Sequence, residues 1–102
     1  MKFVITSCDK KGAKKLSKKL IKRKFAACVS VIKAKSTYVW EREICSEKER
    51  ILLIKTAKKF KKISKFIKSN HSYELPEIAI IKADGVLKKY AKWVRKSTKG
   101  KK

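Results

Sequence analysis

The chain has 102 residues, enough for one domain with a single core. Its hydrophobic content of 43% excludes a disordered basic tail, and no apolar run approaches the ~20 residues of a membrane span. Lys and Arg total 31 against 8 Asp and Glu, a net charge of +23, so the surface attracts polyanions. The first residues enter an apolar strand without a signal-peptide pattern, and we expect a cytoplasmic protein with no membrane contact.

The first half of the chain predicts a strand, a helix and two more strands. Residues 3–8 are rich in β-branched types, as strands are, and Asp9 is suited to cap a helix. That helix ends near Lys24 and has one apolar stripe. The next predicted features are a strand at 26–32, a bend at 33–37, strand character at 38–44 and a charged turn at 45–50.

The second half predicts a strand, a helix, a strand and a short helix. Residues 51–56 form a continuous apolar run, as expected of a central strand. A helix with its apolar side chains on one face follows and ends around residues 69–71. Residues 73–82 predict a strand, in which 78–81 are expected to be buried on both faces. The apolar residues that mark the last helix are Leu87, Tyr90, Trp93 and Val94.

This order of elements predicts an α+β fold of the ferredoxin-like βαββαβ type, with an extra C-terminal helix and helices on one face of an antiparallel sheet. Residues 1–98 form the single domain and 99–102 a basic tail. Because the chain has no second layer for the open face of the sheet, we expect an oligomer, which the long middle hairpin would suit.

Six short segments, in order along nearly the whole chain, resemble the CutA family of divalent-cation tolerance proteins. They are Thr6-Ser7-Cys8-Asp9, Phe25-Ala26-Ala27-Cys28-Val29, Ser36-Thr37-Tyr38-Val39-Trp40, Lys55-Thr56, His71-Ser72-Tyr73-Glu74-Leu75-Pro76-Glu77-Ile78 and Tyr90-Ala91-Lys92-Trp93.

The resemblance implies a ferredoxin-like subunit in a tight homotrimer, binding of Cu²⁺ or another divalent cation, and no established reaction. Three positions depart from the family pattern: Arg42 and Ser72 stand where the family often has Gly and Pro, and Cys8 stands where it has Pro. The strongly basic charge also departs from it, since acidic surface sites for cations become few.

His71 is the only histidine, and two interpretations stay open for it. It can stabilise a helix end, or it can bind a metal, since neutral imidazole is a common transition-metal ligand. Copper would accept imidazole together with thiolate, which makes Cys8 and Cys28 candidate ligands if folding brings one close. The competing interpretation of the cysteines is that of reduced, buried thiols.

A further set of residues is expected at an intersubunit cleft or interface. Aromatic side chains are enriched at interfaces, and Glu74 and Glu77 are acids in a lysine-rich chain that can pair structurally or line a cleft. The full set is Tyr38, Trp40, Lys55, Tyr73, Glu74, Glu77 and Trp93.

The sequence favours a non-enzymatic, trimeric protein involved in divalent-cation (copper) binding and tolerance. The alternative is a basic nucleic-acid- or polyanion-binding protein on the same fold. Residues 51–56 carry no aromatic side chain, unlike the central strand of RNA-recognition domains, so only non-specific binding is expected. No nucleophile with a matching base is evident, and an enzyme ranks last.

Overall fold

The computed structural model describes residues 1–100 and contains one four-stranded antiparallel sheet, in the order β2-β3-β1-β4, with three helices. Lys101 and Lys102 of the predicted tail lie outside the described residues. The predicted α+β, ferredoxin-like order with an extra C-terminal helix is confirmed. The elements are β1 (Lys2–Cys8), α1 (Lys10–Lys22), β2 (Cys28–Trp40), β3 (Glu43–Thr56), α2 (Phe60–Ser69), β4 (Ala79–Lys82) and α3 (Lys88–Ser97).

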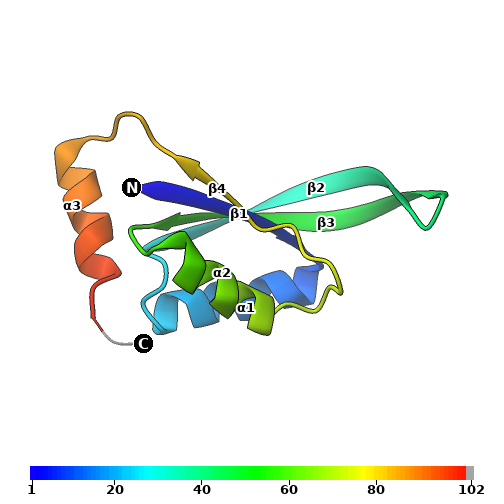
Figure 1. Cartoon of the computed structure of the whole chain (residues 1–102), viewed down its shortest axis with the longest axis horizontal. Coiled ribbons are helices and arrows are strands. Elements are labelled where there is room, and N and C mark those ends of the chain that lie inside the picture. The colour runs from blue at the N-terminus through cyan, green and yellow to red at the C-terminus, as the bar shows by residue number, and fades with distance from the viewer. Residues whose placement is uncertain (101–102) are drawn as a thin grey trace.

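The core lies between the sheet and two helices, because α1 and α2 cover the same face (Figure 1). The predicted stripe of α1 is buried, and so are Ile63 and Ile67 of α2. Leu52 and Ile54 of β3 meet these helices and are fully buried. The other face of the sheet has no covering layer among residues 1–100.

Local capping interactions define both ends of α1. The Asp9 side chain accepts a hydrogen bond from the Gly12 backbone N–H at 2.6 Å, so the helix starts at Lys10, earlier than its first apolar residue suggests. At the other end Lys24 has a φ of 61°, and the Phe25 N–H donates to the Leu20 carbonyl. This Schellman arrangement turns Phe25 into the core, where it is 3% exposed.

The predicted bend at 33–37 and turn at 45–50 are wrong, because β2 and β3 are continuous through both segments. The turn lies at Glu41 and Arg42, whose φ angles are 50° and 67°, as in a two-residue turn with both central residues left-handed. β1 pairs with β3 only from Arg50 to Thr56. Residues 34–49 therefore extend beyond β1 as a two-stranded ribbon, the hairpin arm (Figure 1).

The predicted strand at 73–82 is shorter than expected, since β4 comprises only Ala79–Lys82. β4 is one of the two edge strands and pairs only with Lys2–Ile5 of β1. The expectation that 78–81 are buried on both faces is also wrong: Ile81 is 52% exposed, whereas Ile80 packs against the core. The preceding residues 73–78 form a loop past the end of β1.

Helix α3 lies at the end of the sheet near the N-terminus (Figure 1). Of the four residues that predicted this helix only Val94 is buried, and Leu87, Tyr90 and Trp93 are exposed. Within residues 1–100, no helix has both the length and the apolar character to cross a membrane.

Candidate functional site

A cleft of about 570 Å³ lies between the hairpin arm and the loop at 73–77. Residues that pair across strands point to the same face, so Ser7, Ser36, Glu47 and Glu49 all project from the sheet face that α1 and α2 leave open. We call this the acidic cleft. Its lining residues are Ser7, Ser36, Tyr38, Trp40, Glu47, Glu49, Tyr73, Glu74, Leu75 and Glu77.

The acidic cleft concentrates the few acids of a basic chain. Four of the eight acidic residues line it, whereas no Lys or Arg does among the described residues. Elsewhere basic residues dominate, so this cleft is the place on the described surface where a cation meets several carboxylates without a lysine in the lining.

Hydroxyl groups hold three of the four carboxylates in place. Tyr73 donates its hydroxyl to Glu49 Oε2 at 2.7 Å, Tyr38 donates to Glu47, and Ser7 donates to Glu77 at 3.2 Å. Glu49 is only 8% exposed, so its hydrogen bond offsets part of the cost of burying a charge. Each carboxylate keeps a second oxygen for another partner.

The same contacts keep both tyrosines protonated. The hydrogen bond to Glu47 raises the pKa of Tyr38 to about 12. Burial, followed by the hydrogen bond to Glu49, raises the pKa of Tyr73 above its ordinary value. The phenol groups are therefore donors at neutral pH, and the negative charge of the cleft belongs to its glutamates.

His71 lies next to the cleft, and both of its ring nitrogens are engaged. The Tyr73 N–H donates to Nδ1 at 3.0 Å, which places the proton on Nε2, and Nε2 donates to the Ser7 carbonyl at 2.9 Å. Burial lowers the pKa of His71 despite the opposing effect of the Ser7 hydrogen bond. A neutral imidazole with both nitrogens in use ties the 73–77 loop to the end of β1.

Of the three predicted metal ligands, the fold brings two together. Cys8 Sγ lies 3.4 Å from His71 Nε2, but burial raises the pKa of this thiol to about 11. Cys28 pairs with Lys55 in register with Phe3, which is five residues, or about 16 Å, along β1 from Cys8. No observation on this structure favours the three residues as one site.

The predicted cleft residues divide into two groups. Five of them, Tyr38, Trp40, Tyr73, Glu74 and Glu77, line the acidic cleft. Lys55 lies elsewhere on the open face, where its ammonium donates to Ser30 Oγ at 2.7 Å and to Cys28 Sγ at 3.6 Å.

Trp93, the last of the predicted interface residues, projects from α3 and is 47% exposed.

Sequence reasoning missed Glu47 and Glu49 because it placed them in a turn. The alternation of Glu47, Glu49 and Ile51 was the signal that could have found them, since residues two apart on a strand share a face.

Comparison with known proteins gives relatives over almost the whole chain. "Divalent-cation tolerance protein CutA" of Archaeoglobus fulgidus is 33% identical over 91 residues, covering 88% of this chain and 89% of that protein. The CutA of Thermus thermophilus is 31% identical over 97 residues, covering 93% and 94%. The chain spans about half the length of the chloroplastic CutA proteins of Arabidopsis thaliana and rice, at 31% and 32% identity and 93% of this chain.

Solved structures share the fold closely. Pyrococcus horikoshii CutA superposes with a TM-score of 0.94 at 33% identity, covering 97% of this chain and all of the other. The PII-like protein CutA of Nostoc sp. PCC 7120 superposes with a TM-score of 0.92 at 29% identity, covering 97% and 98%. The sequence profile described as "CutA1 divalent ion tolerance protein" matches residues 1–97, and the chain belongs to this family.

Proposed function

We propose that this chain assembles as a homotrimer that binds divalent cations, copper among them, in its acidic cleft without catalysing a reaction. The observation that supports cation binding best is the gathering of half of the chain's acidic residues in one cleft that no basic residue lines. Relatives that are named for divalent-cation tolerance point to the same class of ligand.

The donor chemistry of the cleft suits such ions. Carboxylate and hydroxyl oxygens bind hard divalent cations, and Cu²⁺ binds a given oxygen or nitrogen site more tightly than the other divalent first-row metals. Among residues 1–100, no group of three or more His, Cys, Asp or Glu side chains is arranged to hold a metal ion. The remaining ligands would then be water or donors from a neighbouring subunit.

Replacing Glu47 and Glu77 together by Gln is expected to weaken Cu²⁺ binding about tenfold, because two of the four cleft charges are lost. Isothermal titration measures this in a background with Cys28→Ser and Cys45→Ser, so that the two partly buried thiols do not capture copper. Comparing Cys45→Ser alone with this background also tests Cys28 as a ligand.

The matched control is Glu41→Gln with Asp84→Asn, which removes the same charge from exposed positions outside the cleft. We expect this control to bind copper within about twofold of the background protein. Equal losses in the two double variants would show that copper responds to net charge and not to the cleft.

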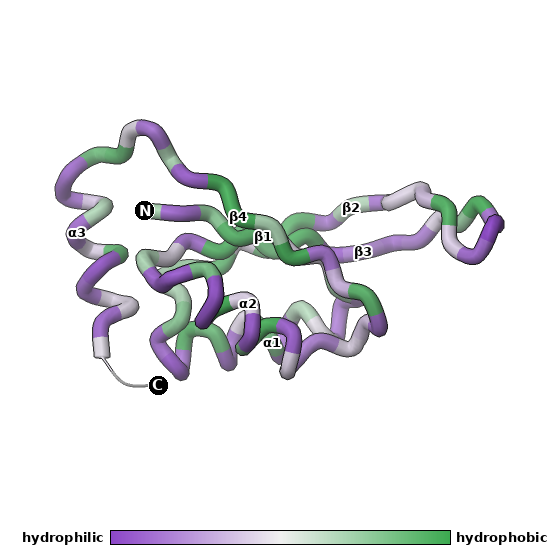
Figure 2. The backbone as a smooth tube through the Cα atoms, in the orientation of Figure 1, coloured by the Kyte–Doolittle hydropathy of each residue, from purple (hydrophilic) through white to green (hydrophobic). Residues whose placement is uncertain are grey.

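The hairpin arm supports the trimer. An isolated two-stranded ribbon is marginally stable in water, and beyond Arg50 the outer edge of β3 has no strand beside it in this chain. Val39 and Ile44, near the tip of the arm, are 68% and 80% exposed, and Figure 2 shows hydrophobic segments on both strands behind the hydrophilic tip. Neighbouring subunits would bury these side chains and pair the free edge.

Light scattering coupled to size exclusion is expected to give about 35 kDa, that is 3 × 11.8 kDa, for the wild-type chain. Val39→Lys with Ile44→Lys should shift the mass toward 11.8 kDa, because charges would replace buried apolar contacts. Ile21→Lys, on the exposed side of α1, is the control and should leave the mass unchanged. A wild-type monomer at physiological salt would contradict the trimer.

The absence of catalysis is supported by the one thiol–imidazole pair. A nucleophilic cysteine needs a lowered thiol pKa and a histidine that accepts its proton. Cys8 is buried with a raised pKa, and the nitrogen of His71 that faces it already carries a proton donated to Ser7. These contacts favour a structural role for the pair.

A second candidate function, non-specific binding of polyanions, is favoured by the net charge of +23. Clustering of the acids in one cleft leaves the rest of the surface more cationic still. The cytoplasmic location expected from the sequence stays a prediction, since the names of similar proteins range from chloroplastic to periplasmic.

A further inference from the structure

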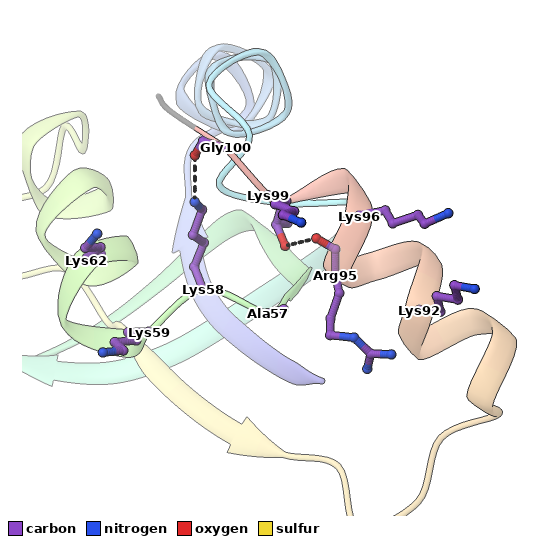
Figure 3. A pocket seen from close by; sticks show the side chains of 10 residues that line it. Ala57, Lys58, Lys59, Lys62, Lys92, Arg95, Lys96, Lys99 and Gly100 are labelled. Carbon is purple, nitrogen blue, oxygen red and sulfur yellow. Dashed lines mark hydrogen bonds between the residues drawn. The ribbon is translucent and has the colours of Figure 1, made fainter.

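A second pocket lies between the start of α2 and the end of α3. It has a volume of about 660 Å³, and Figure 3 shows side chains reaching it from both helices and from the segment before α2. Lys58 Nζ donates to the Gly100 carbonyl at 3.3 Å and thereby joins the two sides. We call this the basic pocket. Its lining residues are Ala57, Lys58, Lys59, Lys62, Lys92, Arg95, Lys96, Thr98, Lys99 and Gly100.

The lining of the basic pocket carries charge of one sign. Seven of its ten residues are Lys or Arg, and no acid lines it. The acidic cleft has the opposite lining. Charge is therefore sorted between two concave sites of one small domain and not spread evenly over its surface.

The two helix ends at the basic pocket partly cancel each other's dipoles. Helix α2 begins here with no acid in its first turn and no side-chain cap, so its positive end adds to the field of the lysines. Helix α3 ends here, and Arg95 and Lys96 in its last turn offset its negative end. Each helix end is equivalent to about half a charge, so the seven side chains decide the sign.

The arrangement of the cations suits a chain of phosphates. Lys59 is the N-cap residue of α2, Lys62 lies in the first turn of α2 and Arg95 in the last turn of α3, whereas Lys92 and Lys96 extend outward on flexible stems (Figure 3). Linked phosphates carry several negative charges along one chain, so they can pair with more of these cations than a single phosphate can. Only Ala57, Thr98 and Gly100 complete the lining, so no aromatic ring is present there to stack on a nucleobase.

We propose that the basic pocket binds an oligophosphate chain, either inorganic or carried by a nucleotide, and that it recognises the phosphates and not the base. The multivalent anion relieves the repulsion among the cations that line the pocket. This site is separate from the acidic cleft, and its specificity goes beyond a general attraction of polyanions.

Isothermal titration of the full chain with sodium tripolyphosphate at ~0.15 M salt tests the proposal, since exposed charges beyond a Debye length of about 8 Å are then screened. The triple change Lys62→Gln, Arg95→Gln and Lys99→Gln is expected to weaken binding about tenfold, because each exposed ion pair contributes a modest part. These three side chains are exposed, so the fold should persist, which circular dichroism checks.

The matched control removes the same charge from the exposed surface of α1 through Lys14→Gln, Lys15→Gln and Lys18→Gln. We expect it to bind tripolyphosphate within about twofold of the wild type. Equal losses in both triple variants would mean that only general polyanion attraction exists, and no measurable binding by the wild type would overturn the proposal as well.

Two further ligands distinguish recognition of the phosphates from recognition of a nucleotide. ATP is expected to bind within about threefold of tripolyphosphate and adenosine not to bind, because the pocket offers the base no stacking surface. ATP binding more than tenfold tighter than tripolyphosphate would show that the nucleoside is recognised and would overturn recognition by phosphates alone.

Discussion

Replacing Leu20 by Ala is expected to lower the free energy of unfolding by about 3.5 kcal/mol, the middle of the range for deleting a buried leucine side chain. Leu20 is fully buried between α1 and the sheet, within the core that also contains Leu16 and Ile54. The loss is large because packed neighbours refill such a cavity only in part. Equilibrium unfolding in guanidinium at one fixed protein concentration measures it, since stability of an oligomer depends on concentration.

The adjacent residue provides the control. Ile21 follows Leu20 in the same helix but is 45% exposed, so Ile21→Ala removes a similar side chain with little cavity. We expect a change within about 0.5 kcal/mol, in part because Ala favours the helix more than Ile does. Similar losses at both positions would mean that α1 does not face the sheet through Leu20.

The helices and the central strand could be predicted because their signals are local. Apolar residues at helical spacing indicated which face of α1 and α2 is buried, and the continuous run at 51–56 indicated the central position of β3. Helix α3 was found for the same reason. Its exposed Tyr90 and Trp93 show the limit of such patterns, since they do not say whether a face is covered by the same chain or left open.

The position of the hairpin turn could not be predicted, because residue types typical of such turns are absent there. Left-handed φ angles usually select Gly or Asn, but this chain puts Glu41 and Arg42 there, and the charged segment at 45–50 resembled a turn more closely. The departure noted at Arg42, where the family often has Gly, was the relevant signal. Pairing of β2 with β3 along the whole arm fixes the turn despite the backbone cost at these two residues.

Only part of the acidic cleft could be predicted, because only part of it is built from residues close together in the sequence. Its loop half could be predicted, because Tyr73, Glu74 and Glu77 belong to one short segment. Its strand half depends on the register of two long strands, which brings Glu47 and Glu49 opposite Ser36 and Ala34. A misplaced turn moves these acids out of the sheet, so the hydrogen bonds to both tyrosines could not be foreseen.

His71→Ala is expected to lower the free energy of unfolding by about 2 kcal/mol while leaving copper affinity within about twofold of the wild type. The stability loss follows because the Ser7 carbonyl and the Tyr73 N–H both lose the ring that bridges them. Guanidinium unfolding of the two proteins measures the first effect, and copper titration of the same pair in the Cys28→Ser, Cys45→Ser background measures the second. Loss of copper affinity with unchanged stability would instead make His71 a ligand.

The pH dependence of stability separates a structural histidine from a general loss of packing. Burial lowers the pKa of His71 below its ordinary value of 6.5, so the folded chain binds fewer protons than the unfolded chain in this range. The contribution of His71 is therefore complete above about pH 6.5 and declines as the pH falls below it. The denaturant midpoint of the wild type should be lower at pH 5.5 than at pH 7.5. The midpoint of His71→Ala should change less between these two pH values, because most carboxylates titrate at lower pH. Equal decreases in both proteins would assign the pH dependence to other groups. They would contradict a neutral His71 that is held by hydrogen bonds at both ring nitrogens.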